Sequence, residues 1–289
     1  MRFVAALAFS APEHFVEVAR TADTCGWHAV AVSDHVLFPR ALASVYPYSP
    51  DGKPLWSAST PWPDPLIAIG AMSAVTTRLR FWTNVYVLPA RNPFLVAKAV
   101  ATAAVLSNNR VTLGIGAGWM REEFELLGQE FRTRGTRTDE AVEMLRVLWQ
   151  GGMVSYHGRF CRFDAVEMSP APTRQIPIYV GGESTAALRR AARYGDGWIS
   201  VLHTTEELRG LIARLNVLRR EWGRADATFD IGVSCSDAFD LDGYRRLQDL
   251  GVTSVLTVPW VLYGDDPTQL DAKRRGLERF ADEIIARCP

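Results

Sequence analysis

A histidine next to a carboxylate is the first feature of this 289-residue sequence that could do chemistry. Asp34 and His35 come directly after the apolar run 29–32, at the point where a buried strand would end. Histidine is the side chain whose charge changes near neutral pH, so an imidazole here could exchange a proton with a bound ligand. A purely structural histidine is the alternative. We take His35 as the candidate catalytic residue.

Gly116 and Gly118 form the first of two glycine clusters that separate a predicted strand from a predicted helix. Glycine tolerates positive φ, so this cluster predicts either a tight turn or a close approach of the backbone to a ligand. When the dinucleotide fingerprint G-x-G-x-x-G is counted from Gly114 and Gly116, Trp119 stands where the third glycine is needed. The sequence therefore argues against a Rossmann site.

The second cluster lies where another strand gives way to a helix, and it consists of Gly181, Gly182, Glu183 and Ser184. Free backbone N–H groups and the helix dipole favour an anion at such a corner. We therefore predict a phosphate site there. The alternative is that Ser184 is a plain N-cap of the helix.

Aromatic side chains gather near the same predicted strand ends. Three tryptophans are predicted at strand exits, namely Trp119, Trp198 and Trp260. The loop over residues 38–63 adds Tyr46, Tyr48, Trp56 and Trp62. Aromatic walls favour a flat, apolar small-molecule substrate, although core packing is the alternative interpretation. We assign the three tryptophans at the strand exits to a substrate pocket.

Metal binding and covalent hydrolysis find little support. The histidines form neither H-x-H nor H-E-x-x-H, so we predict no metal. No G-x-S-x-G elbow is present. The isolated cysteines form no C-x-x-C pair and fit a reducing cytosol better than a disulfide framework; they are Cys25, Cys161, Cys235 and Cys288.

Charge and hydropathy exclude further classes of partner. The chain carries 32 basic and 32 acidic residues, so no electrostatic footprint for nucleic acid is present. The apolar run at residues 3–9 is short for a signal peptide, and no stretch approaches the ~20 apolar residues of a membrane span. We expect a soluble, cytoplasmic protein that contacts neither membrane nor nucleic acid.

The candidate residues would be positioned by short apolar strands that alternate with amphipathic helices, a pattern typical of βα units. Strands are predicted over residues 2–9, 27–33, 79–87, 110–115, 176–180, 198–201, 229–234 and 252–258. Eight such units in one chain predict a single (β/α)₈ barrel over residues 1–289, with an open doubly wound sheet as the competitor. In a barrel, the candidate site lies at the C-terminal ends of the strands.

Two segments interrupt this alternation. Residues 38–63 are rich in proline and aromatics, and so long a connection inside a compact domain is usually a lid or binding loop. Residues 151–175 form an insertion after the fourth helical layer, in which residues 156–160 are predicted to turn between short edge strands. The first helix is predicted to begin at Pro12, with Ser10 as its N-cap.

Several motifs, in their order and spacing, resemble the luciferase-like monooxygenase superfamily. The motifs are Val-Ser-Asp-His at 32–35, Leu-Arg-Phe-Trp-Thr-Asn-Val at 79–85, the glycine-rich run at 110–119, and Ile-Pro-Ile-Tyr-Val-Gly-Gly at 176–182. Residues 156–160 and 194–198 look like further marks of the family. The sequence is most similar to members that use coenzyme F420, a 5-deazaflavin.

The resemblance implies hydride transfer at C5 of the deazaflavin ring. A bulge late in the third strand, often with a non-prolyl cis peptide bond, would support the ring, and His35 would lie beside it. The phosphate would lie against the glycine corner. The implied cofactor-binding residues are Asp34, Thr83, Asn84, Val85, Gly116, Gly118, Gly181, Gly182, Glu183 and Ser184. A homodimer through helices near the second and third strands is also implied.

The sequence departs from the sugar-phosphate dehydrogenases of this superfamily, because Trp119 stands where they carry a carboxylate that acts at the sugar. Glu122 and Glu123 follow on a helix that could turn them away. We therefore expect an F420-dependent oxidoreductase that acts on a small, apolar organic substrate. The alternatives are an FMN-dependent monooxygenase that uses reduced flavin and oxygen, a non-catalytic flavin-binding barrel, and a metal-dependent barrel hydrolase.

Overall fold

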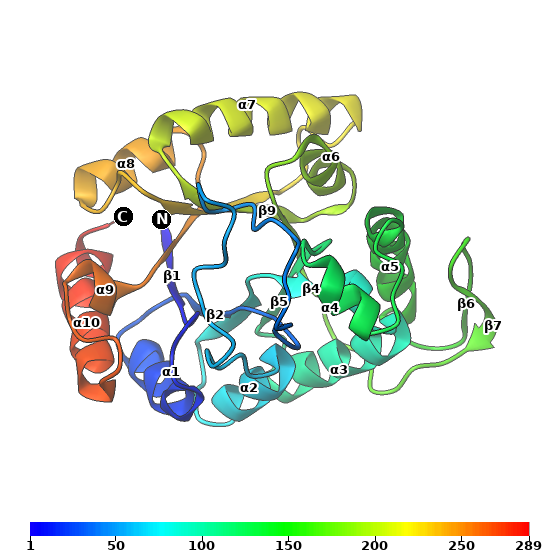
Figure 1. The fold of residues 1–289 in the computed structure, drawn as a ribbon, viewed down its shortest axis with the longest axis horizontal. Coiled ribbons are helices and arrows are strands. Elements are labelled where there is room, and N and C mark those ends of the chain that lie inside the picture. Colours follow the sequence, from blue (N-terminus) through cyan, green and yellow to red (C-terminus); the bar gives the residue numbers. More distant parts are fainter. Residues whose placement is uncertain (289) are drawn as a thin grey trace.

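The computed structural model describes residues 1–288 and contains a closed barrel of parallel strands (Figure 1). The eight strand positions around the barrel are β1 Arg2–Ala6, β2 Ala29–Val32, β3 Arg80–Thr83 continued by β4 Tyr86–Val87, β5 Val111–Gly116, β8 Ile178–Gly181, β9 Gly197–His203, β10 Asp230–Cys235 and β11 Ser254–Thr257. The ring closes because β3 pairs in parallel with both β2 and β5. The predicted (β/α)₈ barrel is confirmed, and the open sheet is excluded.

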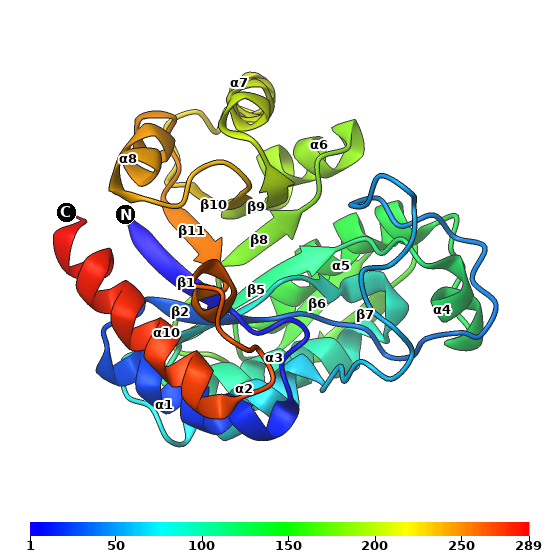
Figure 2. The ribbon, with the colours of Figure 1, turned by 60° about the vertical axis from the view of Figure 1, so that its left-hand side comes forward.

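Helices cover the outside of the barrel, with α1, α2, α3 and α10 on one side and α6, α7 and α8 on the other (Figure 2). The main helices are α1 Phe15–Thr24, α2 Pro65–Ser73, α3 Pro93–Leu106, α5 Arg134–Leu148, α6 Thr185–Tyr194, α7 Thr205–Glu221, α8 Leu241–Asp249 and α10 Leu270–Glu283. The short ones are η1 Pro12–His14, η2 Leu88–Ala90, α4 Arg121–Leu126, α9 Pro259–Leu262 and η3 Ile285–Arg287. No helix within residues 1–288 is both long enough and apolar enough to cross a membrane.

Side-chain caps explain where several of these helices begin. The carboxylate of Asp64 accepts hydrogen bonds from the amides of Leu66 and Ile67, and Ser184 accepts one from the amide of Ala187. The first helix is different, because it begins at Phe15 after a 3₁₀ turn and no side chain caps it. Helical backbone therefore begins at Pro12 as predicted, first as a 3₁₀ turn, but the predicted N-cap Ser10 is wrong because Ala11 holds the N-cap position.

Two apolar layers hold the barrel together. The interior of the barrel is filled by Val4, Ala29, Ala31, Trp82, Tyr179, Ile199 and Leu256, with Val85 packed against them. A larger layer lies between the strands and the surrounding helices. Trp82 fits inside because β10 carries Gly232 opposite it, where a Cβ would lie only 3.0 Å from the indole ring.

Two segments stand apart from the βα repeat. Residues 33–64 form neither helix nor strand, and they pass across the mouth of the barrel (Figure 1). The segment 151–175 holds an antiparallel hairpin of β6 Val154–His157 and β7 Arg162–Val166. The carboxylate of Glu140 on α5 anchors the hairpin by accepting hydrogen bonds from three successive amides, those of Arg159, Phe160 and Cys161.

Candidate active site

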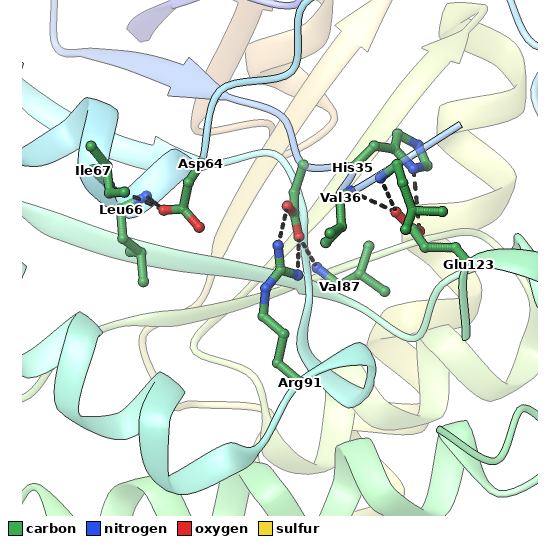
Figure 3. A network of polar contacts seen from close by, with 10 residues as sticks. His35, Val36, Asp64, Leu66, Ile67, Val87, Arg91 and Glu123 are labelled. Carbon is green, nitrogen blue, oxygen red and sulfur yellow. Dashed lines mark hydrogen bonds and ion pairs between the residues drawn. The ribbon is translucent and has the colours of Figure 1, made fainter. Parts of the chain in front are cut away.

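His35 lies directly after β2 and faces Glu123 of α4 (Figure 3). Its Nδ1 is 3.4 Å from Oε2 of Glu123, which is ion-pair range without the alignment of a hydrogen bond. Oε1 of Glu123 accepts hydrogen bonds from the amides of Val36 at 2.6 Å and Leu37 at 3.3 Å. Glu123 is not turned away on its helix, as the sequence allowed; it points inward and is 2% exposed.

The electrostatics of Glu123 favour a carboxylate beside the imidazole. Burial opposes its ionisation, but the neighbouring His35 and the amides of Val36 and Leu37 outweigh burial and hold the pKa of Glu123 below its ordinary value. A fixed negative charge near Nδ1 favours a proton on that nitrogen. Nε2 is then the ring atom that can exchange a proton with a ligand.

Asp34, the neighbour of His35, is fully engaged within the protein. Its two oxygens accept hydrogen bonds from the guanidinium of Arg91 at 2.8 and 2.7 Å, and one of them also accepts from the amide of Val87 at 2.9 Å (Figure 3). Burial disfavours the charged guanidinium, but the Asp34 carboxylate outweighs burial and raises the pKa of Arg91. The structure thus places Asp34 beneath the rim, where it ties β2 to β4.

The third strand of the barrel is interrupted between β3 and β4, where the resemblance implies a bulge. The peptide bond between Asn84 and Val85 is cis, and Thr83 is fully buried with its hydroxyl donating to the carbonyl of Gly114 at 2.7 Å. Oδ1 of Asn84 is buried without a protein hydrogen-bond partner. The break therefore leaves a buried polar atom near the mouth of the barrel.

Gly116 and Gly181 flank the side chain of Val85. A Cβ at either position would lie 2.7 Å from a methyl group of that valine, closer than side chains approach one another. Gly118 has φ +83° and would clash with Phe124 if it carried a Cβ. Packing thus accounts for all three glycines, two of which allow Val85 to sit between β5 and β8.

The predicted anion corner is formed by the end of β8 and the start of α6. Gly182 has φ +107°, and its amide donates to the carbonyl of Ile199 at 3.3 Å. Ser184 caps α6 as its alternative interpretation proposed. The first amides of any helix lack an intrahelical acceptor, so the start of α6 still offers N–H groups to an anion.

Glu183, also at this corner, is held by β9. Its carboxylate contacts Nε2 of His203, whose Nδ1 lies 2.6 Å from the hydroxyl oxygen of Ser200. His203 stands at the end of its strand and is buried, whereas Glu183 remains partly open to solvent. The acidic residue of the corner is thus paired with an imidazole.

Aromatic rings from the long loop surround His35. The imidazole centroid lies 5.0 Å from that of Trp56, 5.1 Å from that of Trp62 and 6.0 Å from that of Trp119. Tyr46 closes the group, at 5.0 Å from Trp56 and 5.2 Å from Trp119. The structure therefore brings Trp119, predicted in the substrate pocket, to the candidate catalytic histidine.

The other two tryptophans assigned to the pocket lie elsewhere. Trp198 is 0% exposed in the layer between strands and helices, and its indole donates to the carbonyl of Gly182 at 2.8 Å. Trp260 is 1% exposed and packs against Gly276 of α10, where a Cβ would clash. Trp198 and Trp260 are therefore core residues, because both are enclosed among the buried apolar side chains between strands and helices.

Sequence reasoning missed the residues that hold this site together. Glu123 faces His35 and Arg91 binds Asp34, just after the end of β2. Glu122 accepts hydrogen bonds from the amides of Ala43 and Ser44 at 2.8 and 3.0 Å. Two consecutive glutamates just after a glycine-rich strand exit were the available signal. Within residues 1–288, no group of three or more His, Cys, Asp or Glu side chains is arranged to hold a metal ion.

A histidine that faces a carboxylate, a buried unpartnered amide oxygen and a helix N-terminus lie at the C-terminal end of the barrel, where (β/α)₈ enzymes carry their active sites. The sequence matches the family of luciferase-like monooxygenases over residues 4–241, and the chain belongs to this family.

Relatives and solved structures agree with this assignment. An uncharacterized protein of Mycobacterium tuberculosis is 41% identical over 99% of this chain and 100% of its own length. An F420-dependent glucose-6-phosphate dehydrogenase of Nakamurella multipartita is 29% identical over 94% of this chain and 76% of its own length. The structure of an F420-dependent secondary alcohol dehydrogenase with an F420-acetone adduct superposes with a TM-score of 0.76 at 18% identity, covering 99% of this chain and 98% of the other. Such relatives indicate an oxidoreductase.

Proposed function

We propose that this protein is a coenzyme F420-dependent oxidoreductase that transfers a hydride between the deazaflavin and a small organic substrate. The observation that carries the proposal is the pair of His35 and Glu123 at the barrel mouth, close to the break between β3 and β4. The pair supplies a positioned proton donor or acceptor, which carbonyl and alcohol interconversion requires. The F420-dependent relatives favour a deazaflavin as the hydride carrier.

The rim offers what an anionic, planar cofactor needs. The amides at the start of α6, after Ser184, would hold its phosphate. Val85, which packs between Gly116 and Gly181, would lie under the ring of the cofactor. The unpartnered Oδ1 of the preceding residue, Asn84, could accept a hydrogen bond from the cofactor. When bound, the deazaflavin would supply hydride transfer at C5, because such cofactors carry the redox chemistry themselves.

The protein's own residues would orient the substrate and handle its proton. The Glu123 carboxylate holds the imidazole of His35 by its Nδ1 side, and Nε2 takes the hydroxyl proton of an alcohol or returns it to a carbonyl oxygen. The aromatic group formed by Tyr46, Trp56, Trp62 and Trp119 covers this histidine and excludes water from it.

An FMN-dependent monooxygenase is the second candidate. The family to which the chain belongs is described by that activity, and the N-terminus of α6 would accept the phosphate of FMN as well as that of F420. The two candidates differ in the oxidant. Oxygen must be consumed by a monooxygenase, whereas hydride transfer to the deazaflavin needs none.

Titration of the purified protein with F420 and with FMN tests the proposal. We expect F420 to bind at least tenfold more tightly, about 1.4 kcal/mol, as measured by quenching of its fluorescence. Incubation of the complex with a panel of secondary alcohols under nitrogen should then bleach F420 without oxygen. Tighter binding of FMN, or turnover that stops without oxygen, would favour the monooxygenase.

We also propose a cytoplasmic homodimer. The apolar helices α2 and α3 lie side by side, and they expose Ile67, Leu95 and Leu106 by 68% or more of each residue. Exposed large apolar side chains on neighbouring helices support an association surface there. Light scattering should show a dimer that Leu95→Glu converts to a monomer, and a monomeric wild-type protein would refute the dimer.

The four unpaired cysteines fit a reducing compartment.

A further inference from the structure

Two tryptophans of the long loop pack against the candidate catalytic histidine and against each other. The rings of Trp56 and Trp62 are 5.0 and 5.1 Å from the imidazole of His35, and 5.2 Å from each other. Phe9, just after β1, packs on both at 6.0 and 5.5 Å. The two indoles are therefore part of one aromatic wall, built by the loop and by the end of β1.

The polar atoms of this wall are unpartnered. Nε1 of Trp56 and Nε1 of Trp62 are both buried without a hydrogen-bond acceptor anywhere in residues 1–288. Buried indole N–H groups normally find an acceptor, because leaving one unsatisfied is costly. Two such donors beside one imidazole indicate that a ligand supplies the missing acceptor.

The first part of the loop that carries these donors is anchored to α4. Glu123 holds the amides of Val36 and Leu37, and Glu122 holds those of Ala43 and Ser44. Ser44 in return accepts a hydrogen bond from the amide of Arg121 at 3.0 Å. Binding a ligand at this wall therefore requires little ordering of the first part of the loop.

The rings of the wall carry no charge of their own. Burial raises the pKa of the neighbouring Tyr46 to about 12, so this ring is an uncharged phenol. The guanidinium of Arg91, on the β2 side, is occupied by Asp34. A phosphorylated sugar would need a cation and several hydroxyl partners here, whereas the wall offers aromatic faces and two N–H donors.

We propose that Trp56 and Trp62 are specificity-determining residues that donate hydrogen bonds to the single oxygen of a flat, uncharged carbonyl compound or of the corresponding alcohol. The assignment to substrate follows from the chain segment involved. Both indoles come from the loop 33–64, whereas the proposed cofactor contacts come from the break between β3 and β4, from the ends of β5 and β8, and from the start of α6. The proposal rests on the proposed function for the transfer of a hydride to or from the substrate. Binding of the substrate oxygen by the two indoles does not depend on that function.

The test compares two probes of the same shape. Acetophenone carries a carbonyl oxygen, and α-methylstyrene replaces that oxygen by a methylene group. Dissociation constants are measured by calorimetry with wild-type protein, both loaded with F420 and free of it. We expect acetophenone to bind roughly tenfold more tightly, as two neutral hydrogen bonds would give. Glucose 6-phosphate should not bind at the same concentrations.

Substitution to phenylalanine removes the indole N–H and keeps an aromatic ring. In Trp56→Phe and Trp62→Phe the preference for acetophenone should fall severalfold, and in the double variant it should approach one. The dissociation constant for F420 should stay within twofold of wild type. Trp222→Phe is the matched control, because this indole is exposed and stacks on Arg193 far from the loop; it should keep the full preference.

Three results would overturn the proposal. They are a preference that survives in the double variant, a loss of F420 affinity in place of acetophenone affinity, and a wild-type protein that binds neither probe. Failure of the proposed function looks different, because F420 would then not bind at all. The ratio of the two probes on cofactor-free protein would still report on the two indoles.

Discussion

The two ends of the barrel treat their polar groups in opposite ways. At the N-terminal end, Arg2 donates to Asp230, and the hydroxyl of Tyr179 donates to the same carboxylate. At the C-terminal end, Nδ1 of His35, Oδ1 of Asn84 and two loop indoles are buried without aligned partners. The charges of Arg2 and Asp230 satisfy each other at the N-terminal end, whereas these four polar atoms at the C-terminal end have no aligned hydrogen-bond partner among residues 1–288.

Two histidines make the same contrast. Burial, followed by the nearby Arg2 and Arg80, lowers the pKa of His28 at the N-terminal end to about 4, so this ring is neutral at working pH. Its edge packs on Trp82 inside the barrel. His35, at the opposite end, instead faces a carboxylate. The comparison teaches that the N-terminal end holds paired or neutral groups, whereas the candidate catalytic histidine lies at the C-terminal end, where (β/α)₈ enzymes carry their active sites.

The largest effect is expected from breaking the buried pair that supports the catalytic end. Arg91→Leu leaves the Asp34 carboxylate, 1% exposed, without its cation. Loss of one partner of a buried pair typically costs about 3–5 kcal/mol of unfolding free energy. Urea denaturation measures this. Arg20→Leu, which breaks an exposed pair with Glu17, is the control and should change little. Equal losses in the two variants would contradict the assignment.

Removal of the proton-exchanging group should affect turnover without affecting the fold. His35→Gln is expected to lower kcat by roughly 100-fold, because general acid–base catalysis contributes at least that much. Affinity for F420 should change less than threefold. The assay follows bleaching of F420 with the best alcohol from the panel. Turnover within fivefold of wild type would rule out His35 as the proton donor or acceptor.

At the N-terminal end, acid should undo stability that Asp230 provides. Burial opposes its ionisation, but hydrogen bonds from Arg2 and Tyr179 outweigh burial and hold the pKa of Asp230 below its ordinary value of 3.8. The contribution is therefore present above about pH 4 and is lost as the pH falls below it. Asp230→Asn should cost about 1–2 kcal/mol at pH 7, reduced by partial exposure, and less at pH 3. Equal costs at both pH values would contradict this.

The smallest effect is expected where only a charge is removed. In Glu123→Gln the amide oxygen can still accept from Val36 and Leu37, so the loop should keep its position. Loss of the negative charge beside Nδ1 should lower kcat about fivefold, because the carboxylate no longer orients the imidazole with its proton on Nδ1. KM should stay unchanged. An unchanged kcat would show that Glu123 only anchors the loop.

The barrel itself could be predicted from the sequence because strand and helix periods are local. Asp64 and Asn92 cap the starts of α2 and α3 by accepting hydrogen bonds from amides two or three positions away, so the signal for these helix starts is local to the sequence. The break between β3 and β4 was predicted from the resemblance. Trp198 and Trp260 were misplaced because proximity to a strand end does not tell which way a side chain points.

Contacts between distant segments were beyond sequence reasoning. Glu123 meets the amide of Val36 across 87 positions, and Arg91 meets Asp34 across 57. Nothing local in either segment specifies the partner, because both contacts depend on how the long loop folds back over α4 and η2. The aromatic wall around His35 arises in the same way.

The most direct test of the central claim, that an anionic redox cofactor is held by the start of α6 near His35, is the affinity of Ser184→Asp for F420. Aspartate is as good an N-cap as serine, so α6 should still fold, but its charge should repel the phosphate. We predict roughly tenfold weaker binding of F420 and unchanged binding of the same deazaflavin without its phosphate-bearing tail. Equal affinity of wild type and variant for F420 would contradict the account.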